Sequence, residues 1–321
     1  MNIGFLILQY AGITSLISFK YFISIDIVKK LKQWSQSAGS IFLIKNVTSE
    51  TLCKNTELGS ENIKKISVHV PKHLRPLSDE QFGHYLAGLI DGDGHFSTQQ
   101  QLVIVFSSED VALAYYIKER LGYGSVKKVK NKNAYLFIIS SKDGMMKVLN
   151  LINGKLRNLS RFNQVINNVL TNSKYIYENL IFRINDTNYY DNHYIAGFSD
   201  ADASFQIKVI SKKNRNKPEI RLNYQIDQKY KDILTLIQEK FGGNICYRKN
   251  QDTYYYGSTS FGSAKEVINY FDTYHLQSSK HINYLKWRKA YIIIQSKGHL
   301  TDLGIKKIMN LKNSMKKLSI R

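Results

Sequence analysis

Proline and cysteine are both scarce in this chain of 321 residues, which contains three prolines and two cysteines. Cys53 and Cys246 lie far apart, so they cannot form a disulfide framework or, by themselves, a zinc site. We expect a reducing compartment and two thiols that act as ordinary packing residues. Arginine is also rare beside lysine, while Tyr, Asn and Ile are abundant. These are the amino acids of A/T-rich codons, which indicates an A/T-rich genome, with an organelle as one candidate.

Acidic residues are few as well, with 25 Asp and Glu against 46 Lys and Arg and a formal charge of +21. Because 43% of the residues are apolar and 12% are aromatic, the chain can bury a core, which excludes a disordered basic tail. Such a surplus of positive charge attracts polyanions, so nucleic acid is the first partner to consider and an anionic membrane the second. Residues 191–321 carry half of the basic residues.

The chain also lacks a long uninterrupted apolar run. Residues 3–23 are mostly apolar but contain Gln9 and Lys20, and their apolar parts fall short of the roughly 20 residues that span a bilayer. The first arginine is Arg75, unlike an arginine-rich transit peptide. The run is either a poorly conforming signal or anchor, or a leftover or packing segment. We expect residues 1–76 to form an extension and linker, and no stable membrane partner.

An internal repeat organises the remainder. Residues 84–96 (HYLAGLIDGDGHF) and 193–205 (HYIAGFSDADASF) share seven of thirteen positions at an offset of 109. Similarity continues at an offset of 120, with the added residues in the segment that follows the motif. The sequence therefore predicts two tandem repeats, 77–190 and 191–321.

Period-two alternation follows each motif. In the second copy, Phe205 and Ile207 alternate with Gln206 and Lys208, which predicts an antiparallel hairpin with one buried face and one polar, open face. A second hairpin is expected at residues 126–130 with 135–140 and at residues 245–248 with 254–258. Helices at residues 110–121 and 230–241 connect the hairpins. The predicted class is α+β, with each repeat reading αββαββα.

Each repeated motif is predicted to be a helix that ends at an acid, Asp93 or Asp202. Both helices carry small residues four positions apart, which lets two helix backbones approach closely: Gly88 and Gly92, Gly197 and Ala201. Packing the helices along a pseudo-twofold axis places the two acids side by side. Paired carboxylates either share a proton or bind a divalent metal. In a basic protein that binds nucleic acid, we favour Mg²⁺ and phosphodiester hydrolysis.

LAGLIDGDG at residues 86–94 and IAGFSDADA at residues 195–203 resemble the paired signature of the LAGLIDADG homing endonucleases, in their two-motif single-chain form. The resemblance covers about residues 77–315. It implies two four-stranded antiparallel sheets that form a DNA-binding saddle, and cleavage of a long, specific double-stranded site. It also implies Asp93 and Asp202 as catalytic, metal-binding acids, with the carbonyls of Gly92 and Ala201 as metal neighbours.

The family also places a basic residue from a later loop beside the metals, and the resemblance makes Lys280 the catalytic candidate. The first copy departs from this pattern, because Ser160 stands at the matching position. Arg161, Lys155 or no residue at all remain open there. For Asp91 and Asp200, which precede the catalytic acids, we expect a structural or metal-adjacent hydrogen-bonding role.

Base recognition is expected on the open faces of the hairpins, where Lys and Arg pair with guanine and Asn and Gln with adenine. The first repeat offers fewer candidates than the second, so we expect a lopsided pattern with more base contacts from the Asp202 half. The candidates are Ser97, Gln99 and Gln101 in the first repeat, and Gln206, Lys208, Arg221, Asn223, Gln225 and Arg248 in the second.

Three functions fit the resemblance. The first is a monomeric, mitochondrial, site-specific endonuclease that mobilises its own intron. The second is a maturase that binds its own group I intron RNA and assists splicing without cleavage. The third is a DNA-binding protein that has lost activity. Two intact acids favour the first over the third, because a non-cleaving binder has little electrostatic reason to keep acids facing phosphate.

Overall fold

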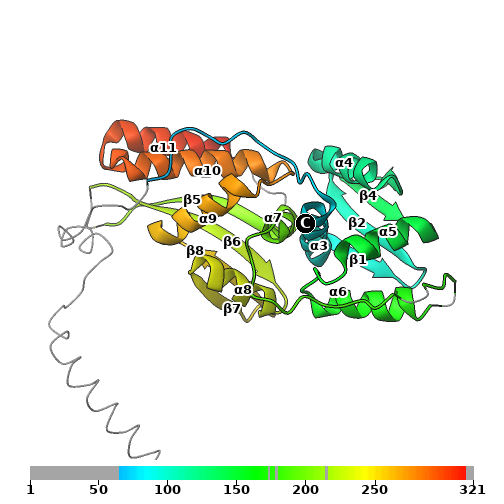
Figure 1. The fold of residues 1–321 in the computed structure, drawn as a ribbon. Coiled ribbons are helices and arrows are strands. Elements are labelled where there is room, and N and C mark those ends of the chain that lie inside the picture. The colour runs from blue at the N-terminus through cyan, green and yellow to red at the C-terminus, as the bar shows by residue number, and fades with distance from the viewer. Residues whose placement is uncertain (1–64, 173, 178–179, 214–215, 316–321) are drawn as a thin grey trace, which may run out of the picture. The chain divides into compact units, whose positions relative to one another are not determined.

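The computed structural model describes residues 65–172, 174–177, 180–213 and 216–315 (Figure 1). The apolar run at residues 3–23 and Cys53 lie outside these ranges, so the expectations for them are not addressed. No helix within the described ranges is long and apolar enough to cross a membrane.

The first repeat begins with the motif helix and folds into a four-stranded antiparallel sheet in the order β1-β2-β4-β3. Its elements are α3 (Asp79–Asp93), β1 (Gly94–Ser97), β2 (Gln101–Ser107), a 3-10 turn (Ser108–Asp110), α4 (Val111–Leu121), β3 (Ser125–Lys128), β4 (Ala134–Ile139), α5 (Lys142–Ile152), α6 (Leu159–Gln164) and a π-helical continuation, η2 (Val165–Leu170).

The second repeat has the same plan, with the sheet order β5-β6-β8-β7. Its elements are α7 (Tyr194–Asp202), β5 (Ala203–Ile210), β6 (Glu219–Gln228), α8 (Asp232–Phe241), β7 (Asn244–Arg248), β8 (Thr253–Ser258), α9 (Phe261–Thr273), α10 (Lys280–Gln295), a 3-10 turn (Gly298–Leu300) and α11 (Asp302–Ser314). The predicted α+β class and tandem two-sheet architecture are confirmed.

Each motif helix passes directly into a strand. Asp93 is the last residue of α3, and Gly94 already has extended backbone angles (φ −87°, ψ 159°). Asp202 ends α7, and Ala203 has nearly the same angles (φ −84°, ψ 157°). Each catalytic candidate therefore stands at a junction held by a helix on one side and a sheet on the other.

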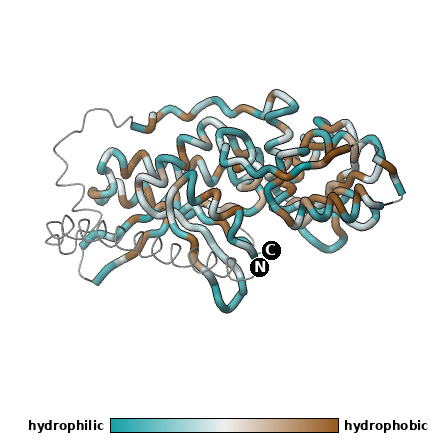
Figure 2. The backbone as a smooth tube through the Cα atoms, turned by 60° about the horizontal axis from the view of Figure 1, so that its bottom comes forward, coloured by the Kyte–Doolittle hydropathy of each residue, from teal (hydrophilic) through white to brown (hydrophobic). Residues whose placement is uncertain are grey.

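The sheets bury one face and leave the other open. In β2, Leu102, Ile104 and Phe106 are buried, and the residues between them are only partly covered. Along the helices and strands, polar and apolar residues follow one another at short intervals (Figure 2), as expected for elements with one face in a core. Cys246 lies exposed on the edge strand β7. The expectation that this thiol is a packing residue is therefore wrong, because its register opposite Tyr255 puts it outside the core.

Residues 65–77, the blue segment in Figure 1, form a strap along the second repeat. Ile66 exchanges hydrogen bonds with the Gln295 side chain, both of 2.9 Å. The Arg288 guanidinium donates to the carbonyls of Ser67 and His69. The strap thus attaches to α10 before the chain enters α3.

Candidate functional site

The two motif helices pack at contacts that only glycine permits. A Cβ atom on Gly88 would lie 2.0 Å from the Tyr194 carbonyl oxygen, and one on Gly197 would lie 1.9 Å from the Tyr85 carbonyl oxygen. Both distances are far below van der Waals contact, so α3 and α7 touch backbone to backbone. The predicted close packing through small residues is confirmed.

This packing brings the two candidate acids to the same end of the helix pair. A Cβ on Gly92 would meet Ala201 Cβ at 2.3 Å and Asp202 Oδ2 at 2.9 Å. The Asp202 carboxylate therefore lies against the backbone of the residue that precedes Asp93. Gln228, at the end of β6, donates its Nε2 proton to Asp202 Oδ2 at 2.7 Å. This amide contact was not anticipated from the sequence.

The oxygen atoms available as metal ligands at this end suit a hard cation. They are the carboxylates of Asp93 and Asp202 and the carbonyl of Gly92. Within the described ranges, no cluster of three or more His, Cys, Asp or Glu side chains is arranged to hold a metal. Mg²⁺ is commonly bound through one or two carboxylates, with water and substrate phosphates completing its shell. The residues present thus fit Mg²⁺ in a site that substrate completes.

Lys280 lies at the start of α10 and is 8% exposed. Its Nζ donates to the Ala201 carbonyl at 2.6 Å and to the Ser199 carbonyl at 3.2 Å. A cation there offsets the negative end of the α7 dipole. The Ala201 carbonyl accepts this lysine proton, and its place beside a metal stays a prediction.

Arg161 is the basic group beside the acids in the first repeat. Burial lowers the pKa of its guanidinium, while attraction to Asp91, Asp202 and Asp93 opposes that effect. Lys155, the other candidate, forms an ion pair with Glu80 at 3.1 Å. Glu80 lies about 20 Å from Asp93 along α3, because an α-helix rises 1.5 Å per residue. Arg161 is thus attracted to the acids, while Lys155 pairs with Glu80; a catalytic role for Arg161, for Lys155 or for neither stays a prediction.

The buried acids Asp91 and Asp200 connect the repeats reciprocally. Tyr194 donates its hydroxyl proton to Asp91 Oδ2 at 2.6 Å, and Tyr85 donates to Asp200 Oδ2 at 2.7 Å. Asp91 also accepts from the backbone N–H groups of Arg157 and Asn158. The expected structural hydrogen-bonding role agrees with this geometry, but the tyrosine partners were missed.

Burial raises the pKa of Asp91 to about 6, although its hydrogen bonds to Tyr194 and the backbone act in the opposite direction. Burial likewise raises the pKa of Asp200, against the lowering effect of Ser278, Gln277 and Tyr85. The signal for the tyrosines was available in the sequence, because they occupy the same position in both copies.

The open face of the second sheet carries a hydrogen-bonded chain of polar side chains. The Asn223 side-chain amide lies 3.2 Å from the side-chain amide of Gln206 and 3.2 Å from that of Gln225. Gln225 Nε2 donates to Asp227 Oδ2 at 2.9 Å, and Arg248 pairs with Asp227 at 2.5 Å. Asn223 is only 2% exposed, so it holds its neighbours in place rather than reaching outward.

Lys208 and Arg221 are paired across β5 and β6 on the same face, and both are exposed. Arg221 Nε contacts Glu219 Oε1 at 2.5 Å, and Lys212 pairs with the same carboxylate. These basic groups extend the polar face toward the tip of the long hairpin. Base contact by any of these residues remains a prediction.

The first sheet differs on its open face. Ser97 and Gln101 are paired across β1 and β2 and partly exposed, and Gln99 is exposed in the turn between the strands. Beyond them, the face is aliphatic, with Val103 beside Ile138. The sequence reasoning did not anticipate this.

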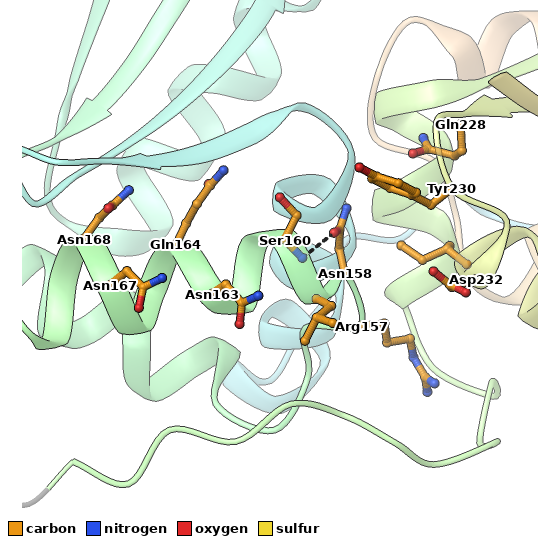
Figure 3. Close-up of a pocket in the computed structure, with 12 residues that line it drawn as sticks. Arg157, Asn158, Ser160, Asn163, Gln164, Asn167, Asn168, Gln228, Tyr230 and Asp232 are labelled. Atoms are coloured by element: carbon orange, nitrogen blue, oxygen red, sulfur yellow. Dashed lines mark hydrogen bonds between the residues drawn. The ribbon is translucent and has the colours of Figure 1, made fainter. Parts of the chain in front are cut away.

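A cavity of about 720 Å³ is lined in part by Gln228, the residue that hydrogen-bonds Asp202 (Figure 3). The amide-bearing wall of α6 and η2 faces Gln228 and Tyr230 across it. Gln164 and Asn168 from that wall bond the N–H and C=O of Phe96, so they protect the edge strand β1. This role also went unpredicted.

Comparisons with known proteins agree with this geometry. A family model described as LAGLIDADG endonuclease matches residues 86–165 and 195–291. An uncharacterized 37.2 kDa protein of cox1 intron 2 from Schizosaccharomyces pombe is 56% identical over an alignment of 320 positions that covers 95% of this chain and 96% of that protein. From Saccharomyces cerevisiae, the intron-encoded DNA endonuclease aI3 is 30% identical over 69% of this chain and 66% of its own length.

The intron-encoded RNA maturase bI4 of Saccharomyces cerevisiae is 29% identical over 72% of this chain, which spans only 35% of that maturase. Among solved structures, the meganuclease I-SmaMI bound to uncleaveable DNA matches with a TM-score of 0.58 and 20% identity, over 73% of this chain and 99% of its own. The LAGLIDADG meganuclease I-CpaMI bound to uncleaved DNA matches with a TM-score of 0.59 and 20% identity over the same shares. Fold, motif geometry and sequence similarity thus agree that this chain belongs to the LAGLIDADG endonuclease family.

Proposed function

We propose that this chain is a site-specific, metal-dependent endonuclease that cuts both strands of the intron-free allele of its host gene and so promotes homing of its intron. The observation that carries the proposal is the placement of Asp202 against the backbone beside Asp93, at the common end of two packed helices. The relatives named as intron-encoded endonucleases and the DNA-bound meganucleases support it.

Mg²⁺ fits the donors at this end, where Asp93, Asp202 and the Gly92 carbonyl would hold it; once bound, it would activate water and stabilise the leaving oxygen. The chain itself counters the repulsion between carboxylates and DNA phosphates. Arg161 supplies positive charge in the first repeat, and Lys280 supplies it at the α7 end. The two repeats thus use different basic groups for the same electrostatic task.

Recognition of the site is assigned to the open faces of the two sheets, and the formal charge of +21 draws in the duplex. Because one chain supplies both acids and both sheets, we propose that it acts as a monomer, with the repeats bounded at residues 77–190 and 191–321. The similarity to a cox1 intron protein and the abundance of amino acids with A/T-rich codons support expression in mitochondria. Sedimentation at the mass of a single 37.1 kDa chain would test the monomer.

The test is cleavage of a plasmid that carries the joined exons flanking the intron that encodes this chain. With Mg²⁺, the protein should make one discrete double-strand cut. Asp93→Asn and Asp202→Asn should abolish cutting while retaining DNA binding in a gel-shift assay, because each removes a carboxylate that repels phosphate. Glu266→Gln, an exposed change on α9, is the matched control and should cut normally. Normal cutting by Asp202→Asn would refute the assignment.

A maturase activity is the second candidate, favoured by the similarity to the RNA maturase bI4. In that case the protein should bind its own intron RNA saturably and accelerate splicing in vitro. Asp202→Asn should then splice as well as the unmodified chain, because no phosphodiester bond is hydrolysed by the protein. Intron binding and splicing without any DNA cut would favour the maturase over the endonuclease.

A further inference from the structure

Four aliphatic side chains gather at the centre of the open face of the first sheet. The register pairs Val103 with Ile138 and Val105 with Leu136 across β2 and β4. The buried neighbours Leu102 and Ile104 point to the core, so the four lie on the opposite face, where each is only partly covered. We call these four residues the aliphatic patch.

The patch is not a general property of the fold, because the second repeat is polar at the matching places. The two hairpins can be aligned at their first paired residues, which are Gly94 with Ile104 in the first repeat and Ala203 with Ile226 in the second. In this alignment, Val103 corresponds to Gln225, and Val105 corresponds to Asp227. Gln225 lies beside Gly257, and Asp227 beside Tyr255. One sheet presents hydrogen-bonding groups where the other presents methyl groups.

The surroundings of the patch suit DNA. Lys127 lies beside Leu136, and His95 lies beside Val103, so positive and polar groups border the patch. Strand β1 starts directly after Asp93, which puts His95 only two residues, or roughly 7 Å, from the acid. A duplex placed with its phosphates at the acids therefore lies over this face.

Thymine is the base that presents an apolar group, its 5-methyl, in the major groove. Aliphatic side chains bury that methyl favourably, whereas the polar edges of the other bases would lose water without gaining a partner. We propose that the first repeat recognises thymine methyl groups through the aliphatic patch, while the second repeat reads its half-site by hydrogen bonds. This inference rests on the proposed DNA-binding function and assigns the chemistry of one half-site.

The test uses the duplex that the plasmid assay identifies, with each thymine replaced singly by uracil, which removes only the methyl group. Burial of one methyl contributes about 0.8 kcal/mol, so each contacted thymine should cost about four-fold in Kd at 25 °C when replaced. We expect such losses at two or more positions within one half-site, and changes below about two-fold in the other.

A double-mutant cycle assigns the effect to the patch. In Leu136→Ala, the rise in Kd on replacing thymine by uracil, which we call the uracil penalty, should disappear at one or more positions, because the side chain that covers the methyl is gone. Val105→Thr, which keeps the size of the side chain but replaces one methyl group by a hydroxyl, is a second variant in case Leu136→Ala lowers stability. It should also reduce the loss of affinity caused by uracil. Gln206→Ala on the second sheet is the control and should leave the penalty unchanged.

Several outcomes would overturn the inference. Uracil tolerated at every position of a duplex that is still bound and cut would exclude methyl recognition while leaving the nuclease function intact. A penalty that persists in both patch variants would place recognition elsewhere. Dimers at working concentration, together with uracil tolerance, would instead identify a second copy as the occupant of the patch. Absence of any DNA binding or cutting would overturn the proposed function itself.

Discussion

Tyr85 and Tyr194 occupy the same position in the two repeated motifs, and each donates a hydrogen bond to the buried acid of the other repeat. The acids Asp91 and Asp200 are 1% and 4% exposed. A buried carboxylate without donors is costly, because its charge has left water. At the residue scale, these two bonds therefore join the motif helices and fix their relative rotation, which sets where Asp93 and Asp202 stand.

Replacing Tyr194 by Phe should destabilise the protein by about 1.5–3 kcal/mol, the range for hydrogen bonds to charged groups. The ring stays, so the loss isolates the hydroxyl that donates to Asp91. Urea denaturation measures the change, and Tyr85→Phe should give a similar loss by pseudo-symmetry. A change below about 0.5 kcal/mol in both variants would show that the reciprocal bonds do not hold the repeats together.

At the scale of elements, the strap of residues 65–77 attaches next to the loop that presents Lys280. His73 donates a hydrogen bond from Nε2 to the Leu276 carbonyl oxygen, 2.8 Å away. Its ring centroid lies 5.2 Å from that of His275 and 4.5 Å from that of His281. Three imidazoles so close cannot all be charged without mutual repulsion. The strap is therefore expected to detach more easily in acid.

His281 makes this pH dependence measurable. Burial, helped by His73 and His275 and opposed by Asp272, lowers the pKa of His281 from 6.5 to about 4. The unfolded chain then binds more protons than the folded one between these values, so this stability is complete above pH 6.5 and lost as pH falls toward 4. After allowance for partial exposure, we expect a loss of about 1–2 kcal/mol. Urea midpoints at pH 7.5 and 5 should differ less in His281→Gln than in the exposed control His69→Gln.

The β5–β6 hairpin holds part of its positive charge in internal pairs. Glu219 contacts Arg221 and Lys212, and those two partners lower the pKa of Glu219 to about 2. We expect Glu219→Gln to tighten binding to non-specific duplex DNA a few-fold, because it frees two cations for phosphate. Folding stability should change by less than about 0.5 kcal/mol, as for most surface pairs. Titration of labelled random-sequence duplex measures the effect, and unchanged or weaker affinity would contradict it.

For the whole molecule, function depends on the interface between α3 and α7, which forms the joint between the two repeats. The contacts of Gly88 and Gly197 bring α3 and α7 together, and the acids stand at the end of that joint. The net charge of +21 is spread over the chain and provides attraction but not selectivity. Division of labour between a polar and an aliphatic sheet then supplies the proposed selectivity.

Gly197→Ala tests the joint directly. The added Cβ would lie 1.9 Å from the Tyr85 carbonyl oxygen, so the helices must separate, and we expect a loss of about 3 kcal/mol or more. Cleavage should fall with it, because the two acids move apart. Gly262→Ala on α9 is the matched control: apart from its chain neighbours and the nearby backbone of its own helix, no atom lies within 4 Å of its Cβ position, and alanine favours a helix. Thermal unfolding of the two variants should differ sharply, and equal unfolding temperatures would contradict close packing.

The repeat, the α+β class, the hairpins and the helix ends that carry Asp93 and Asp202 could all be predicted from the amino-acid sequence. These follow from local periodicity and from a motif present twice, both of which depend on residues close in the chain. Which distant groups lie near the acids depends on tertiary packing. Gln228 reaches Asp202, and Lys280 reaches the Ala201 carbonyl. Arg161 is attracted to the acids, but whether Arg161, Lys155 or no residue serves as the basic group of the first repeat stays a prediction. The tertiary structure also revealed the aliphatic patch, because strand register across β2 and β4, which no single strand encodes, sets those side chains together.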